Sequence, residues 1–215
     1  TPAVAVNASG NYVVVWESFD QDGDENGIYA QQYDPLGNPL GSEIQVNTTT
    51  SGNQSDPVVA IDASGNFAVA WTNDGADNDV YVRYFDSSGT AVTGEVQANT
   101  TATNDQDSPA IAMNADGDFV VVWESSGTLT NGVYGQRFDN TGSAVGSEIT
   151  IANNIVYVQG EPAVAIDDDG DFVVSWTYSD ILPGDQIFAR RFDSTGAPLS
   201  GAFQVNSTNP GDQDS

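Results

Sequence analysis

The chain has 215 residues, of which 31 are acidic and four are arginine, and it contains no lysine, histidine or cysteine, so its formal net charge is −27. The missing cysteines exclude disulfides and thiolate chemistry, and the missing histidines and lysines exclude the usual nucleophile–base pairs of enzymes. A field this negative repels nucleic acids and anionic membrane surfaces, and no apolar run approaches the roughly 20 residues of a membrane-spanning helix.

From its first residue onward the chain reads as one repeat domain, 1–215, made of four copies of one unit. The units cover approximately residues 1–56, 57–108, 109–161 and 162–215. Successive tryptophans lie 55, 52 and 53 residues apart, at Trp16, Trp71, Trp123 and Trp176. One proline in each unit keeps the same spacing: Pro2, Pro57, Pro109 and Pro162. A fixed register over four copies is typical of a repeat architecture.

Each unit contains the same succession of short strands and turns, which is clearest in the third. The predicted strands there are Pro109–Met113, Phe119–Trp123, Val133–Phe138 and, marginally, Glu148–Ile151. Alternate side chains of a strand face opposite ways, so Phe119, Val121 and Trp123 share one face, and Val120 and Val122 share the other. Both faces are apolar, which predicts that this strand is covered on both sides.

Four short antiparallel strands, one of them covered twice, are typical of a β-propeller blade. We therefore predict an all-β fold, a β-propeller of four four-stranded antiparallel blades. Half of an eight-bladed ring completed by a second chain, or β-sandwiches that pair two units, would also fit. The pattern at Gln213–Ser215 continues in register at Thr1-Pro2. This predicts either a closed ring of four units or a stretch of a longer tandem array.

Three repeated motifs carry a resemblance to a known group of proteins. They are Asp-x-x-Gly-Asn/Asp-Phe-Val-Val-x-Trp, then Gly-Ile-Tyr-Ala-Gln-Arg-Phe-Asp-x-x-Gly, then Gly-x-Glu-Ile-Gln-Val-Asn-Thr. The pattern resembles the tandem repeats of large secreted bacterial surface proteins, which often stand beside calcium-binding haemolysin-type or cadherin-like modules. The resemblance covers the whole chain and implies an extracellular or cell-surface location and a structural or adhesive role.

A glycosidase needs only two carboxylates, so the missing histidines do not exclude one. A catalytic pair should break the repeat, yet the acidic residues lie mostly in turns and recur between units, as Asp34, Asp86, Asp139 and Asp193 do. The four arginines, Arg83, Arg137, Arg190 and Arg191, resemble the arginine cluster of sialidase propellers but occupy repeated strand positions. These observations favour structural roles and predict that the chain is not an enzyme.

Calcium is the stronger chemical signal, because two loops offer closely spaced oxygen ligands around a glycine. The candidate ligands are Asp20, Asp22, Asp24 and Asn26 in the first unit, and Asp74, Asp77 and Asp79 in the second. Asp167–Asp171 forms a further dense acidic turn. The alternative is a set of solvated acidic loops, which a cation would stabilise by screening their charges.

Five Asn-x-Ser/Thr sequons provide candidate glycosylation sites at Asn7, Asn47, Asn53, Asn99 and Asn206. Asn47, Asn99 and Asn206 fall at one repeat position, after the fourth strand. The alternative interpretation is that Asn-x-Thr is favourable turn chemistry.

The residues that recur are core and turn residues, which favours scaffolding. The sequence therefore predicts a non-enzymatic extracellular structural or adhesive module, a spacer or filament subunit that associates with itself or with neighbouring repeat domains. The alternative is a carbohydrate-binding, lectin-like propeller with glycans as partners. Because the four tryptophans are predicted core residues, Tyr157 and Tyr178 are its candidate aromatic contacts.

Overall fold

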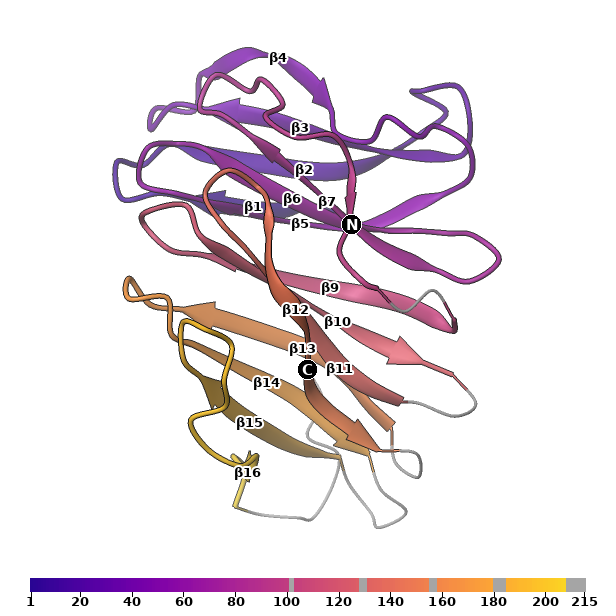
Figure 1. The fold of residues 1–215 in the computed structure, drawn as a ribbon. Helices are drawn as coiled ribbons and strands as arrows, with labels where there is room; N and C mark the ends of the chain where they lie inside the picture. Colours follow the sequence, from indigo (N-terminus) through magenta and orange to yellow (C-terminus); the bar gives the residue numbers. More distant parts are fainter. Residues whose placement is uncertain (101–102, 128–130, 155–157, 180–184, 208–215) are drawn as a thin grey trace.

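A computed structural model describes residues 1–100, 103–127, 131–154, 158–179 and 185–207. Over these residues the chain forms four antiparallel sheets of four strands each (Figure 1). Each sheet consists of strands that are consecutive in the sequence, so each repeat unit forms one blade. The predicted β-propeller of four four-stranded antiparallel blades is confirmed. None of the described segments is a helix long and apolar enough to cross a membrane.

The strands keep the same order in every blade. Blade 1 consists of β1 (Ala3–Val6), β2 (Tyr12–Phe19), β3 (Asn26–Tyr33) and β4 (Pro39–Gln45). Blade 2 consists of β5 (Gln54–Ile61), β6 (Phe67–Asn73), β7 (Asp79–Phe85) and β8 (Val96–Gln97). Blade 3 consists of β9 (Asp105–Met113), β10 (Phe119–Ser126), β11 (Asn131–Phe138) and β12 (Ala144–Asn154). Blade 4 consists of β13 (Val158–Ile166), β14 (Phe172–Ser179), β15 (Gln186–Phe192) and β16 (Phe203–Gln204).

Side-chain-capped turns explain why acidic residues and asparagines recur. In the turn after β1, Asn7 Oδ1 accepts hydrogen bonds from the backbone N–H groups of Ser9 and Asn11, both at 3.1 Å. Gly10 has a φ of 86°, a conformation that a residue with a side chain rarely adopts. In the turns after the third strands, hydrogen bonds from side chains and backbone lower the pKa of four aspartates: Asp34, Asp86, Asp139 and Asp193. These residues form turns.

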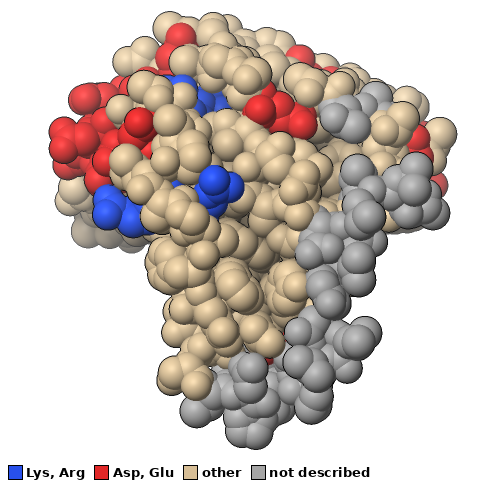
Figure 2. All heavy atoms as spheres, turned by 60° about the horizontal axis from the view of Figure 1, so that its bottom comes forward, with Lys and Arg blue, Asp and Glu red and all other residues tan. Residues whose placement is uncertain are grey.

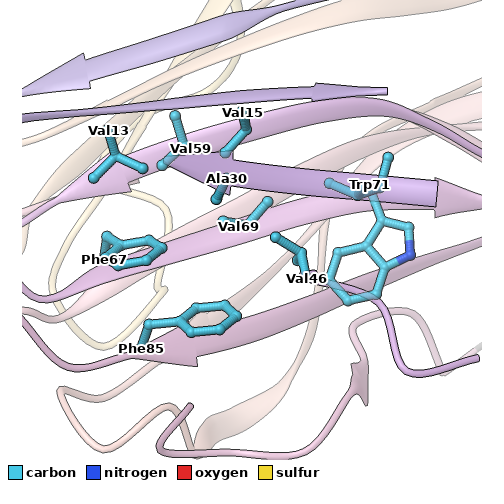
Figure 3. Close-up of a cluster of buried hydrophobic side chains, with 10 residues drawn as sticks. Val13, Val15, Ala30, Val46, Val59, Phe67, Val69, Trp71 and Phe85 are labelled. Carbon is cyan, nitrogen blue, oxygen red and sulfur yellow. The ribbon is translucent and has the colours of Figure 1, made fainter. Parts of the chain in front are cut away.

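The core consists of three apolar clusters, one at each boundary between consecutive blades. At the first boundary, Val13 and Val15 of β2 pack against Phe67, Val69 and Trp71 of β6 (Figure 3). The opposite face of β6 contributes to the next cluster. In blade 3, every residue of the segment 119–123 is at most 1% exposed, so the prediction of a strand covered on both faces is confirmed.

The first strands of the blades lie side by side at the inner edge of the molecule: β5 contacts both β1 and β9, and β9 contacts both β5 and β13. The same repeat position of every blade is therefore brought to one place.

Candidate functional site

The prolines that begin each unit surround one open hollow of about 420 Å³. Its lining comes from all four blades: Thr1, Pro2, Ala3, Asp56, Pro57, Val58, Ser108, Pro109, Glu161 and Pro162. Asp56, Ser108 and Glu161 precede their prolines with φ angles of 51°, 52° and 50°. The strand register shifts at each of these positions, as in a β-bulge. Such bulges re-aim side chains and are over-represented next to active sites.

In blades 1 and 3 the residue after the tryptophan is a glutamate that bonds the bulge of the following blade. Glu17 Oε1 accepts a hydrogen bond from the backbone N–H of Asp56 at 2.9 Å. Glu124 Oε2 accepts one from the backbone N–H of Glu161 at 3.3 Å. Blades 2 and 4 have Thr72 and Thr177 at this position. The position therefore alternates between a carboxylate and a hydroxyl around the molecule.

One strand pair in blade 3 places two carboxylates face to face. Asp107 of β9 is the direct partner of Glu124 of β10. Directly opposite residues of an antiparallel pair have Cβ atoms about 4.5–5.5 Å apart. Blade 2 has Ser55 opposite Thr72, and blade 4 has Gly160 opposite Thr177. The acidic pair is therefore a break in the repeat.

Both members of this pair hold their protons more tightly than ordinary carboxyl groups. Burial first, and then the charges of Asp107 and Glu161, raise the pKa of Glu124, although the hydrogen bond from Glu161 N–H opposes them. Burial first, and then the charges of Asp105, Asp56 and Asp74, raise the pKa of Asp107. Carboxyl groups whose pKa is perturbed by burial and by a neighbouring charge are typical of functional sites.

Blade 4 supplies a third carboxylate next to this pair. Glu161 Oε2 accepts a hydrogen bond from Thr177 Oγ1 at 2.9 Å. Gly160 lies beside it, and a side chain there would push the Glu124 carboxylate out of its observed position. A second hollow of about 260 Å³ opens at this point, lined by Glu124, Val158, Gly160, Glu161, Thr177, Ser179 and Asp185. Glu124 and Glu161 can both reach a molecule bound there.

The carboxylate on the blade 1 side behaves in the opposite way. Burial raises the pKa of Glu17, but hydrogen bonds from Asp56 N–H and contacts with Thr1 outweigh burial and lower it. The centre of the molecule thus combines a carboxyl group that stays ionised with two that resist ionisation. Different environments for neighbouring carboxyl groups are the usual basis for separate acid and base roles.

The structure distributes the candidate calcium ligands among several partners. Asp22 Oδ2 accepts a hydrogen bond from Asn47 at 3.0 Å, Asp74 Oδ2 one from Asn53 at 2.7 Å, and Asp79 Oδ1 one from Asn99 at 2.7 Å. Among the residues that the structure describes, no three acidic side chains are placed to share a metal ion. Asp22 Oδ1 is buried without a hydrogen-bond partner, which favours a cation at that loop. Calcium binding stays a prediction.

Two of the five sequons are part of the folded framework. Asn47 and Asn99 are 1% and 3% exposed, and their Oδ1 atoms accept hydrogen bonds from the backbone N–H groups of Ile28 and Val80. Asn206 Oδ1 accepts the equivalent bond from Ile187. This supports the turn-chemistry interpretation of the repeated position. A glycan attaches at Nδ2, so on Asn47 or Asn99 it would displace the hydrogen bond that Nδ2 donates to Gln54 or to Asp79. Glycosylation of Asn7 and Asn53 stays a prediction.

Two of the candidate arginines and Tyr178 make contacts that hold the fold together. Arg83 donates to the carbonyl of Val46 at 2.7 Å, and Arg190 to that of Ile151 at 3.0 Å, so each joins its blade to the preceding one. Tyr178 is half-buried and packs against Phe188. Tyr157 lies outside the described residues.

Neither a protein-family model nor a curated protein matches this sequence. Solved structures do match it in fold. A protein of unknown function from Dyadobacter fermentans has a TM-score of 0.64 at 12% identity, over 94% of this chain and 68% of that one. An endo-arabinase from Bacteroides thetaiotaomicron has a TM-score of 0.58 at 15% identity, over 97% of this chain and 81% of that one. A thermostable family-43 glycoside hydrolase has a TM-score of 0.56 at 14% identity, over 98% of this chain and 77% of that one.

These similarities correct two predictions, namely that the chain is not an enzyme and that it is a structural or adhesive module. Both are wrong, because almost the whole chain has a fold that glycoside hydrolases use. The physical reason is that a pair of catalytic carboxylates depends on strand register, which the repeated turn residues do not reveal. The aspartates of the turns repeat, whereas Asp107 and Glu124 become partners only through strand register across a bulge. The resemblance to surface-protein repeats stays a prediction.

Proposed function

We propose that the chain is a glycoside hydrolase that cleaves neutral glycans at the centre of the propeller. The observation that carries this proposal is the Asp107–Glu124 pair, which breaks the repeat and whose Glu124 lines the hollow between blades 3 and 4. The fold shared with an endo-arabinase and a family-43 glycoside hydrolase supports it.

Glycoside hydrolysis needs one carboxylic acid that keeps its proton and a second carboxylate that is ionised. Glu124 is the general acid, because burial and the charge of Asp107 raise its pKa and retain the proton for the leaving oxygen. Asp107 lies directly opposite, and Glu161 lies across the blade boundary. The charge of Asp107 helps to keep the proton on Glu124, so in this arrangement Asp107 is ionised although burial raises its own pKa. Asp107 or Glu161 is then placed to attack the sugar or activate water.

The charge of the site defines the substrate class. Asp56, Glu124 and Glu161 line the two hollows of a chain whose net charge is −27. Glu17 bonds Asp56 and Asp107 lies opposite Glu124, so both add to this negative field. A uronic acid would enter against this field, whereas neutral pentose or hexose polymers would not. Neutral glycans such as arabinan, xylan or mannan are therefore the expected substrates.

The test is release of reducing sugar from arabinan, xylan and mannan, with polygalacturonate as the anionic comparison. We expect hydrolysis of at least one neutral polymer and none of polygalacturonate. Glu124→Gln should lower kcat about 10²–10⁴-fold, the usual contribution of a general acid. Glu43→Gln, an exposed carboxylate that bonds Gln21, is the matched control and should leave the rate unchanged.

A second measurement identifies the ionised partner. Azide can replace a missing carboxylate nucleophile, so Asp107→Asn and Glu161→Gln are each assayed with and without azide. Rescue in one variant, with a glycosyl azide product, assigns the nucleophile. Absence of hydrolysis on all three neutral polymers, or a Glu124→Gln protein that works at the parent rate, would contradict the proposed function.

A further inference from the structure

Each blade has two faces that meet its neighbours, and the two faces differ in chemistry. At the boundary between blades 1 and 2, the face of blade 2 is aromatic, with Phe67 and Trp71. The face of blade 1 that covers it is aliphatic, with Val13, Val15 and Val46. The boundaries between blades 2 and 3 and between blades 3 and 4 repeat this pairing around Trp123 and Trp176. The molecule thus displays the same interface three times.

Blade 1 carries an aromatic face of this kind that no described blade covers. Its members are Val4, Val6, Tyr12, Val14 and Trp16, which we call the blade 1 end face. Its rings stack as in the other blades, Tyr12 on Tyr33 and Trp16 on Tyr29. Val4 is 65% exposed, whereas Val59 at the same repeat position is 8% exposed. The blade 1 end face therefore has the residue types of a blade interface, but its side chains are exposed.

Blade 4 carries the matching aliphatic face. Its members are the aliphatic Val173, Ala189 and Val205 and one aromatic residue, Phe203, which with Arg191 form the blade 4 end face. Val205 is 56% exposed, whereas Val46, Ala98 and Ile151 at the same repeat position are at most 2% exposed. Figure 2 turns the blade 4 end of Figure 1 toward the viewer, and charged side chains gather over the upper part of that view while the lower part has few.

Polar contacts identify what should cover the blade 4 end face. Gln32 donates to the carbonyl of Ser87 at 3.2 Å, and Arg137 donates to that of Thr195 at 2.9 Å. Both acceptors lie in the turn after the third strand of the following blade. Arg191 occupies the same strand position in blade 4 and is exposed. It is placed to bond the corresponding turn of a further blade.

We propose that one further unit of this repeat docks between the two end faces and closes the ring. Solved structures of similar fold extend beyond the part that this chain matches. The match takes in 97% of this chain but 81% of the endo-arabinase, and 98% against 77% for the family-43 enzyme. About a fifth of those two chains is thus left over, and about a third of the Dyadobacter fermentans protein, which is enough for at least one further blade beside four. A second copy of this chain would bring four blades to that gap.

The test fuses a copy of the second unit, Pro57–Ser108, after Ser215 and compares the fusion with the parent chain. This unit carries Arg83, which bonds the fourth-strand carbonyl of the preceding blade and would find that of Val205. A second fusion uses the third unit, 109–161. The first readout is acrylamide quenching of tryptophan fluorescence. Three tryptophans of the parent are at most 3% exposed and Trp16 is not among them, so Trp16 accounts for its quenchable emission.

We expect both fusions to be monomers, to lose the quenchable emission of Trp16 and to gain about 5 °C or more in Tm. Val4→Asp with Val6→Asp, and separately Arg191→Ala, should leave the parent's Tm nearly unchanged and reduce the gain in the fusions. Val92→Asp is the matched control, since Val92 is 52% exposed and belongs to blade 2, which carries neither end face.

Four outcomes would overturn the proposal. The first is that the fusions keep the quenching and the Tm of the parent, and the second is that the added unit stays unfolded in both fusions. The third is that the parent is a dimer with a protected Trp16, which would make a second copy the occupant. The fourth is that the parent is a monomer with a protected Trp16, which would mean that blade 4 closes directly on blade 1. None of these readouts depends on catalysis, so failure of the proposed hydrolase activity leaves the test intact.

Discussion

Blades 2 and 3 have the same strand order, the same capped turns and a buried tryptophan at the same position, yet their inner strand pairs differ in chemistry. Blade 2 places Ser55 opposite Thr72, and blade 3 places Asp107 opposite Glu124. Thr72 is 1% exposed and its Oγ1 has no hydrogen-bond partner, whereas Glu124 borders a hollow and bonds the next blade. The two blades therefore share one backbone arrangement and differ in the chemistry of this one strand pair.

The largest effect should follow from making blade 3 like blade 2. The double variant Asp107→Ser, Glu124→Thr removes the proposed acid and its partner while keeping residues that this strand pair accommodates in blade 2. We expect hydrolysis of neutral glycans to fall about 10²–10⁴-fold, because transfer of a proton to the leaving oxygen is lost. The measurement is kcat on the best neutral polymer.

The control for this variant is its fold. Far-ultraviolet circular dichroism and Tm should stay at or above the parent values, because two groups that resist ionisation have been removed from a partly buried site. A double variant that folds and retains full activity would show that the difference between the blades has no catalytic meaning.

The architecture could be predicted from the sequence because it depends on local signals that occur four times. Gly10 and its equivalents mark a turn that needs positive φ, and the run Phe119–Trp123 predicts a strand covered on both faces. Repetition strengthens each signal, since a chance pattern would not recur at 52 to 55 residues. The blades follow from these elements.

The site could not be predicted in the same way, because it depends on register. Asp107 and Glu124 are 17 residues apart, and the bulge at Ser108 and Pro109 decides that they become partners. One signal was available in the sequence. The residue after each tryptophan alternates between a glutamate, Glu17 or Glu124, and a threonine. A comparison confined to the turns misses it.

The second prediction concerns how the stability of the protein, measured as Tm, depends on pH when Glu124 is replaced. The folded protein raises the pKa of Glu124 above the value in the unfolded chain, so it binds the proton more tightly than the unfolded chain does. Stability from this group is complete below the unfolded pKa and is lost as pH rises through the folded one. Glu124→Gln should therefore raise Tm at pH 7, and the advantage should disappear near pH 4.

The comparison for this prediction is Glu17→Gln, at the same position of blade 1. The folded state lowers the pKa of Glu17, so the sign reverses and this variant should lower Tm at pH 7. Tm is measured for the parent and both variants from pH 3.5 to 7.5. Two variants with the same pH trend would contradict the assignment of opposite environments to the two glutamates.

The smallest effect is expected in blade 2, at the position that matches the proposed acid. Thr72→Val replaces a buried hydroxyl that lacks a hydrogen-bond partner with a methyl group of nearly the same shape. Removing an unsatisfied buried group should raise the free energy of unfolding by about 1 kcal/mol, with no change in kcat. Urea unfolding measures the first quantity and the glycan assay the second. A loss of activity in this variant would place blade 2 in the catalytic site and remove the contrast with blade 3, because the hydroxyl would then have a role that only bound substrate reveals.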